Sequence, residues 1–96
     1  MNGMITVHAQ YQSRFREITQ VERESFELET PRVAELAARI TGKYGPTMQA
    51  LLLDADGENL NTRGTLYLNS RGERVYIEDS LYDGDTIYFM VGIAGG

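Results

Sequence analysis

The stretch TPRVAELAARITGKYG, residues 30–45, carries the clearest periodic pattern in the chain. Its apolar residues recur three and four positions apart, a spacing that places them on one face of an α-helix. Thr30 can cap the start of this helix, and Pro31 suits its first position. Gly45 followed by Pro46 predicts where the helix ends. The side chains expected to face the core are Val33, Leu36, Ala37 and Ile40.

Two segments before this helix alternate apolar and polar residues. Both MITVHAQY, residues 4–11, and RESFELE, residues 23–29, show the period of two that is typical of half-buried strands. The polar residues 12–17 between them predict a turn, so that the two strands form an antiparallel hairpin with a long connection. The side chains expected on the buried faces are Ile5, Val7, Ala9, Phe26 and Leu28.

The segments after the helix predict further strands and turns. ALLLDADGE, residues 50–58, reads as a short apolar strand that ends in a turn, and residues 65–79 read as two short strands around Arg71–Gly72. YDGD, residues 82–85, predicts another turn rather than a site. In the last strand, residues 86–93, the apolar positions Ile87, Phe89 and Val91 alternate with Tyr88 and Met90.

The order of these segments indicates the fold class. Strands that are segregated from a single main helix favour an α+β domain with the helix packed across a mixed sheet. In such a domain the first strand can lie centrally and pair in parallel with the last strand. We expect one domain over residues 1–96, with a shared core made of Ile5, Val7, Phe26, Leu28, Val33, Leu36, Ile40, Leu52, Leu68, Ile87 and Phe89.

Composition limits the functions that the chain can have. The 14 acidic and 9 basic residues give a formal net charge of −5 without a cluster of lysine or arginine, which argues against a nucleic-acid partner. The same charge favours either solubility alone or a partner with a basic entrance. A chain of 96 residues has room for one core but not for a deep enclosed active site, so we expect a carrier or binding protein rather than an enzyme.

The residue types that are missing exclude several kinds of chemistry. The sequence contains no cysteine, which excludes a disulfide scaffold, a cysteine-ligated metal site and a thiol nucleophile of its own. It shows neither an apolar run of about 18 residues nor the features of a signal peptide, so we expect a cytoplasmic protein without a membrane partner. His8 is the only histidine and has no nucleophile or metal ligand near it in sequence, so we expect no catalytic residue and no metal site.

The chain ends in VGIAGG, residues 91–96, with two terminal glycines. An α-carboxylate has a reference pKa of about 3.5, so the carboxylate of Gly96 is expected to be ionised and able to attack the α-phosphate of ATP at neutral pH. An extended chain from Gly92 to Gly96 could reach roughly 17 Å. Because glycine lacks a side chain, Gly95 and Gly96 allow the tail to enter a narrow pocket of another protein.

Two long runs resemble the ubiquitin-like sulfur-carrier family, which includes the small subunit of molybdopterin synthase (MoaD) and the thiazole-forming carrier of thiamine synthesis (ThiS). Residues 14–45 resemble the first half of that family. Residues 66–96 resemble the second half, with Leu68–Asn69, Asp83–Asp85 and the final glycines in the expected order. The chain departs from the family pattern in having MVGI where such carriers often have a proline before the tail, and in a longer excursion from Asp54 to Arg63.

The resemblance implies a β-grasp (ubiquitin-like) fold with a flexible C-terminal Gly-Gly tail at about residues 92–96. It also implies that an E1-like adenylating enzyme uses ATP to adenylate Gly96, and that a sulfur donor protein converts the adenylate to a thiocarboxylate. The sulfur would then be delivered on an acceptor similar to the large subunit of molybdopterin synthase, in synthesis of the molybdenum or tungsten cofactor. The chain itself would bind no cofactor and supply no catalytic group.

Partner docking is expected beside the tail. Tyr88 and Met90 alternate with the core positions of the last strand, so we expect them to face outward and, with Ile93, to form a docking surface. Packing of Tyr88 and Met90 under a neighbouring loop is the alternative.

Three other functions fit the same sequence: a protein modifier joined to lysines of its targets through Gly96, a thiamine-pathway sulfur carrier, and a β-grasp interaction module with an idle tail. Lys43 is the only lysine, so self-linked chains through a lysine side chain could form only there. Its position near the end of the predicted helix favours a role in complementing the helix dipole over a role as acceptor.

Overall fold

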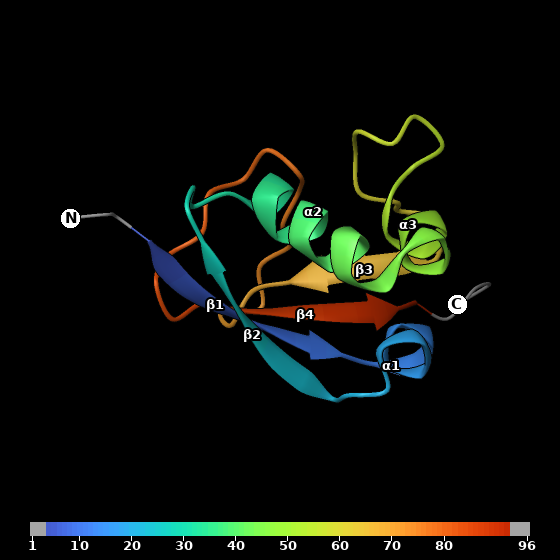
Figure 1. Cartoon of the computed structure of the whole chain (residues 1–96), viewed down its shortest axis with the longest axis horizontal. Helices are drawn as coiled ribbons and strands as arrows, with labels where there is room; N and C mark the ends of the chain where they lie inside the picture. Colours follow the sequence, from blue (N-terminus) through green and yellow to red (C-terminus); the bar gives the residue numbers. More distant parts are fainter. Residues whose placement is uncertain (1–3, 93–96) are drawn as a thin grey trace.

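The computed structural model describes residues 4–92 of the chain, and its strands form one mixed sheet in the order β2-β1-β4-β3 (Figure 1). The central strand β1 (Ile5–Tyr11) pairs antiparallel with β2 (Arg23–Leu28) and parallel with β4 (Thr86–Val91). The short strand β3 (Thr65–Leu68) pairs antiparallel with the other side of β4. The parallel pairing of the first strand with the last strand is as predicted.

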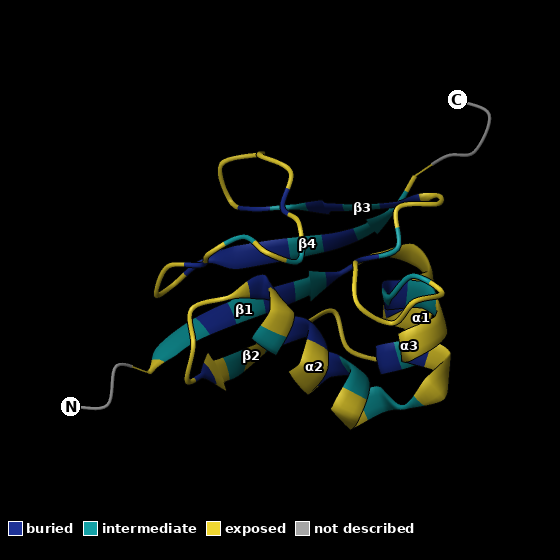
Figure 2. Cartoon of the chain, turned by 90° about the horizontal axis from the view of Figure 1, so that it is seen from above, coloured by how far each residue is buried: buried dark blue, intermediate teal, exposed yellow. Residues whose placement is uncertain are grey.

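The helices of the described residues cover one face of this sheet (Figure 2). The longest, α2 (Val33–Tyr44), packs across the sheet, while α1 (Ser13–Thr19) and α3 (Pro46–Leu52) close the same core at the end where β4 finishes. This arrangement confirms the α+β class and the helix packed across a mixed sheet. No described helix covers the opposite face, which is therefore the open face of the sheet.

The core lies between the helices and the covered face of the sheet. Phe89 is central to it, because its ring centroid lies 5.5 Å from that of Tyr11 and 5.7 Å from those of Phe15 and Tyr67. Ten of the eleven predicted core residues belong to this layer, with Ile5 and Phe26 half-buried at its edge. The fully packed ones are Val7, Leu28, Val33, Leu36, Ile40, Leu52, Ile87 and Phe89.

The helix predicted from residues 30–45 is present, but its start differs from the prediction. The N-cap is Arg32 rather than Thr30, and Pro31 lies before the helix. Thr30 instead donates its hydroxyl and its backbone N–H to the Glu35 carboxylate, each at 2.6 Å. The helix ends at Gly45 as predicted, because a φ of +86° at this residue breaks the helical path.

The turn predicted over residues 12–17 is wrong, since residues 13–17 belong to α1 and Gln12 is its N-cap. The helix is only seven residues long, too short to be stable through its own hydrogen bonds. Phe15 and Thr19, four residues apart, both point into the core, and Gln20 ends the helix in a left-handed conformation. Burial of Phe15 therefore decides the conformation of a segment whose other residues are mostly polar.

The strand predicted at the start of ALLLDADGE is also wrong. Ala50, Leu51 and Leu52 form the last turn of α3, whose first residue is Pro46. Met48 and Leu52 lie four residues apart and are both buried, which is the spacing of a helix face. Only Leu53 makes a strand-like contact, an isolated bridge with Leu60.

In β3 the predicted buried position is wrong by one residue. Tyr67 is buried and Leu68 lies on the open face, because Tyr67 pairs with Phe89 while Leu68 pairs with Tyr88. Tyr67 can enter the core because its hydroxyl donates a hydrogen bond of 2.9 Å to the carbonyl of Asn61. The second short strand predicted after Arg71–Gly72 is reduced to an isolated bridge between Leu68 and Arg74.

Candidate functional site

The open face of the sheet carries an apolar patch on β3 and β4. Pairing in register brings Leu66 beside Met90 and Leu68 beside Tyr88. These four residues, the β3–β4 patch, alternate with the buried Tyr67 and Phe89, so their side chains point away from the helices. Each of the four is half-buried rather than fully exposed. Tyr88 and Met90 therefore point outward as predicted. The structure adds Leu66, for which the sequence predicted no role, and Leu68, which was predicted to lie in the core.

The rest of the open face is polar. On β1 and β2, three cross-strand pairs project to this side: Thr6 with Glu27, His8 with Ser25, and Gln10 with Arg23. The His8 Nδ1 lies 2.7 Å from the Ser25 hydroxyl, and Arg23 donates to the Gln10 amide oxygen at 3.4 Å. The open face is thus divided into a polar half on β1–β2 and an apolar half on β3–β4, the strands nearest to the C-terminal segment.

The base of the C-terminal segment is anchored by backbone. The Gly92 N–H donates to the Gly64 carbonyl at 2.7 Å, just beyond the end of β4. The loop that presents this carbonyl is ordered by Asn61, whose side chain accepts from the Arg63 N–H and donates to the Leu51 carbonyl, each at 2.9 Å. Gly64 has a φ of +80°, a conformation that favours glycine. The backbone at Gly92, the last described residue, is therefore held in a defined position. Ile93, Gly95 and Gly96 lie outside the described residues, and their expected roles stay predictions.

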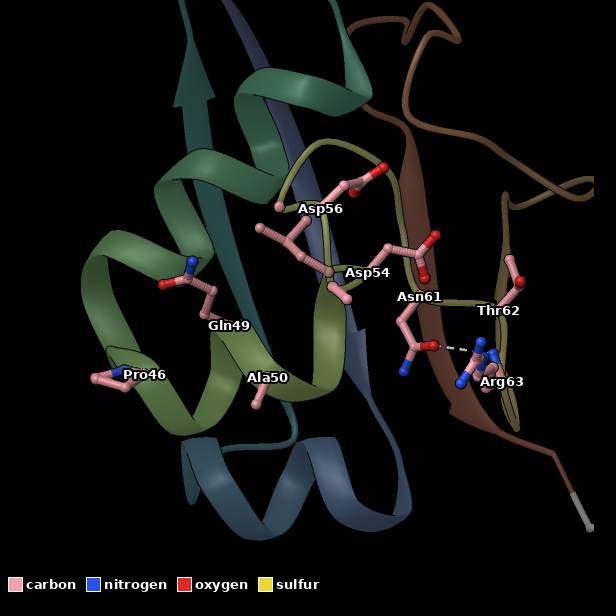
Figure 3. A pocket seen from close by; sticks show the side chains of 11 residues that line it. Pro46, Gln49, Ala50, Asp54, Asp56, Asn61, Thr62 and Arg63 are labelled. Atoms are coloured by element: carbon pink, nitrogen blue, oxygen red, sulfur yellow. Dashed lines mark hydrogen bonds between the residues drawn. The ribbon is translucent and has the colours of Figure 1, made fainter.

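An open hollow of about 860 Å³ lies next to this anchor, between α3 and the loop over residues 54–63 (Figure 3). Asp54, Asp56 and Arg63 are its charged lining residues. The Asp56 carboxylate is occupied by its own loop, since it accepts from the backbone of Glu58 at 2.8 Å and from the side chain of Asn59 at 3.1 Å. The longer excursion from Asp54 to Arg63 thus forms a loop that is stabilised by hydrogen bonds between its own residues.

The turn at Asp83–Asp85 supports the sheet. The Asp83 carboxylate accepts from the Thr6 N–H at 2.8 Å, and the Gly84 N–H donates to the Thr6 carbonyl at 2.7 Å. The Asp85 carboxylate accepts from the Tyr82 N–H at 3.0 Å. These bonds confirm the prediction of a turn, and they join the start of β1 to the start of β4.

Neither a metal-binding cluster nor a membrane-spanning helix is found between Met4 and Gly92. The histidine, aspartate and glutamate residues of this part of the chain form no group of three or more that could hold a metal ion. None of its helices combines the length and the apolar character that crossing a membrane requires.

Comparison with models of known protein families gives no match, and no curated protein matches the sequence. Solved structures do match, over nearly the whole chain. The crystal structure of SAMP1, a small archaeal modifier protein of Haloferax volcanii, superposes with a TM-score of 0.79 at 16% identity and covers 95% of this chain and 99% of its own.

Two other structures extend this comparison. A Pyrococcus furiosus protein proposed to be molybdopterin converting factor, subunit 1, gives a TM-score of 0.70 at 23% identity, with 93% of this chain and 99% of that chain covered. Urm1 from Trypanosoma brucei gives 0.71 at 20% identity, with both chains covered completely. The chain therefore has the ubiquitin-like β-grasp fold that the resemblance implied. At these identities the likeness establishes the fold, and function has to be argued from the site.

Proposed function

We propose that this chain is a carrier protein whose C-terminal carboxylate, on Gly96, is adenylated by an E1-like partner enzyme and converted to a thiocarboxylate. The observation that supports this proposal is the position of the β3–β4 patch. The patch includes Tyr88 and Met90 of β4, the strand that leads directly into the C-terminal segment. A partner bound to this patch would be close to the point where the segment begins. The four residues after Gly92 can then span at most about 14 Å into its active site.

The reaction asks little of the chain itself. A carboxylate oxygen of Gly96 attacks the α-phosphorus of ATP, and pyrophosphate leaves. The outer sulfur of a persulfide on a donor protein then attacks the acyl carbon, and AMP leaves with the electron pair of the broken C–O bond. A thiol of the donor or its partner next attacks the inner sulfur of the S–S bond that joins the two proteins, which forms a disulfide and releases the thiocarboxylate on Gly96. In this proposal the partners supply the catalytic groups and the ATP site, and the chain supplies a docking surface and a carboxylate on a narrow tail.

The recipient that we propose for the sulfur is the molybdopterin precursor, held by an acceptor protein similar to the large subunit of molybdopterin synthase. Two observations support this pathway over the thiamine pathway: the sequence resembles the molybdopterin type, and the fold matches the protein proposed to be molybdopterin converting factor, subunit 1.

The second candidate function is protein modification, in which the activated Gly96 is joined to lysines of target proteins. The similarity to SAMP1 supports it, because that protein is named as a modifier and superposes with the higher TM-score of 0.79. Both functions begin with the same adenylation. They differ in whether sulfur or a lysine amine displaces AMP.

Deletion of Gly96 tests the shared first step. The truncated tail is shorter by about 3.5 Å, and a misplacement of ~1 Å at a reacting group can cost about a hundredfold in rate. We expect ATP–pyrophosphate exchange with the adenylating enzyme of the same organism to be lost, while the free energy of unfolding changes by less than about 0.5 kcal/mol. Gly42→Ala, at an exposed helix position with open space around it, is the matched control and should exchange normally. Full exchange without Gly96 would contradict the proposal.

Mass spectrometry of the protein from its native host separates the two functions. A carrier should gain the mass difference between one sulfur atom and one oxygen atom on the intact chain. A modifier should instead leave a Gly-Gly remnant on lysines of other proteins.

A further inference from the structure

Lys43 is the only lysine of the chain, and it is held by a carboxylate of another element. It lies in the last turn of α2, where its Nζ donates to the Glu24 Oε1 at 2.6 Å. Glu24 belongs to β2, so this ion pair joins the end of the helix to the edge of the sheet. The sequence placed Lys43 at the helix end but gave no sign of this partner, which lies 19 residues away.

The Glu24 carboxylate is fixed independently of the lysine. Its second oxygen, Oε2, accepts from the Tyr11 hydroxyl at 2.7 Å and from the Tyr44 hydroxyl at 2.6 Å. Burial raises the pKa of Glu24, but the hydrogen bonds from Lys43, Tyr44 and Tyr11 together lower it below its ordinary value. Burial and the neighbouring Glu24 raise the pKa of both tyrosines. At neutral pH the carboxylate is therefore charged, and both hydroxyls keep their protons.

Aromatic rings add to the hold on the ammonium group. The Lys43 Nζ lies 5.5 Å from the ring centroid of Tyr44 and 5.8 Å from that of Phe26, distances at which a ring attracts a cation. The side chain of Lys43 is nevertheless 54% exposed, against 13% for Glu24. The ion pair and the two rings, rather than burial, therefore hold the ammonium group of Lys43 in place.

This environment opposes acylation of Lys43. An amine attacks an acyl carbon with its lone pair, so Nζ must first give up a proton to water and leave its partner carboxylate. The bond from Nζ to the acyl carbon then forms, and AMP departs with the electrons of the broken C–O bond. The contacts with the carboxylate and the two rings hold Nζ in place, and they have to be broken before this attack.

We propose that Glu24, which is held by the hydroxyls of Tyr11 and Tyr44, forms with the rings of Tyr44 and Phe26 a clamp that protects Lys43 from acylation by an activated copy of this same chain. Its one lysine is thereby a slower acceptor than a lysine without such contacts, which favours passage of the acyl group of an adenylated copy to sulfur or to another protein. The slower reaction of Lys43 is inferred from the geometry of the clamp alone, whereas its consequence for an activated copy rests on the proposed function.

The test measures lysine acetylation in the full chain with N-hydroxysuccinimidyl acetate and peptide mass spectrometry at neutral pH. Arg14→Lys provides a reference lysine in the same molecule, because Arg14 is exposed on α1 and makes no ion pair within the described residues. We expect Lys43 to react about two- to fivefold more slowly than the reference lysine, the range set by ion pairs of this kind. Glu24→Gln, which keeps an oxygen acceptor for the tyrosines but removes the charge, should raise the rate at Lys43 by a similar factor.

Equal rates at the two lysines in the Arg14→Lys protein would overturn the clamp, and this comparison holds even where Glu24→Gln fails to fold. An unchanged rate at Lys43 in a folded Glu24→Gln protein would overturn it as well. The acetylation uses neither ATP nor a partner enzyme. Loss of the proposed function would instead appear in ATP–pyrophosphate exchange, so the two failures are distinguishable.

Discussion

The two faces of β4 carry side chains of similar size in opposite surroundings. Phe89 and Ile87 are buried under the helices, whereas Tyr88 and Met90 stay half-exposed on the open face. On the covered side, Phe89 packs against the rings of Tyr11, Phe15 and Tyr67. On the open side, Tyr88 and Met90 belong to the apolar half of the face, over which no described helix lies. One side of the strand thus stabilises the fold, and the other side carries the patch to which we propose that a partner binds.

The largest effect is expected on the covered face. Replacing Phe89 by alanine should lower the free energy of unfolding by about 3–5 kcal/mol, because it removes ring contacts with Tyr11, Phe15 and Tyr67 and leaves a cavity. Leu36→Ala, on the helix side of the same core, should cost about 2–5 kcal/mol. Denaturant unfolding measures both values. Losses below about 0.5 kcal/mol at both positions, typical of surface sites, would contradict the packing described here.

A charge on the open face should affect binding more than folding. Met90→Glu should weaken binding to the adenylating enzyme by about 2 kcal/mol, the scale of a hot spot, while the thermal midpoint stays nearly unchanged. Tyr88→Glu should act in the same way. Gln10→Glu, on the polar half of the same face, is the matched control and should bind normally. Titration calorimetry measures the binding free energy of each variant. Unfolding of the Met90→Glu protein would contradict the prediction, because it would mean that Met90 belongs to the core.

A smaller effect on stability is expected at Gly64, whose carbonyl accepts the hydrogen bond from Gly92. Gly64→Ala should cost about 1–2 kcal/mol, because a Cβ disfavours the left-handed backbone at a φ of +80° even with open space around it. The same change at Gly42, inside α2, should stabilise the protein by about 0.5–1 kcal/mol. Thermal unfolding of the two variants should therefore shift in opposite directions. Equal shifts would mean that the backbone at Gly64 is not strained by a side chain.

The smallest effect on stability is expected for Glu35 in the first turn of α2, and it depends on pH. Hydrogen bonds from Thr30 and from the backbone of Glu29 and Thr30, with a further one from Arg39, lower the pKa of Glu35 from 4.5 to about 2. Because the folded-state pKa is lowered, this stabilisation is complete above pH 4.5 and is lost as the pH falls toward about 2. Glu35→Gln should remove about 1 kcal/mol or less at neutral pH, since the group is near the surface. Unfolding curves that remain equally separated at all pH values would contradict this assignment.

The helix over residues 33–44 could be predicted because its apolar residues repeat with one clear period. The alternation in β1 and β4 was equally informative, and it identified Tyr88 and Met90 as outward-facing. In contrast, α1 is too short to show a clear period. Phe15, Ile18 and Thr19 face the core, and the residues that receive the Phe15 ring, such as Phe89, lie far away in sequence. The leucines at 51–53 were ambiguous because a short apolar run fits a helix and a strand equally well.

The sequence by itself determined the α+β class, the main helix, the parallel pairing of the first strand with the last strand, and the outward side of β4. Each of these depends on a local period or on the order of the segments. Tertiary structure decided which face of β3 enters the core. Residues 65–68, TLYL, are apolar or able to be buried on both sides, so their own pattern sets no preference. Pairing of Tyr67 with Phe89 selects the side of β3 that is buried. The faces of the remaining residues of the strand are then fixed, because side chains alternate with a period of two. The same pairing turns Leu66 and Leu68 outward and so completes the β3–β4 patch.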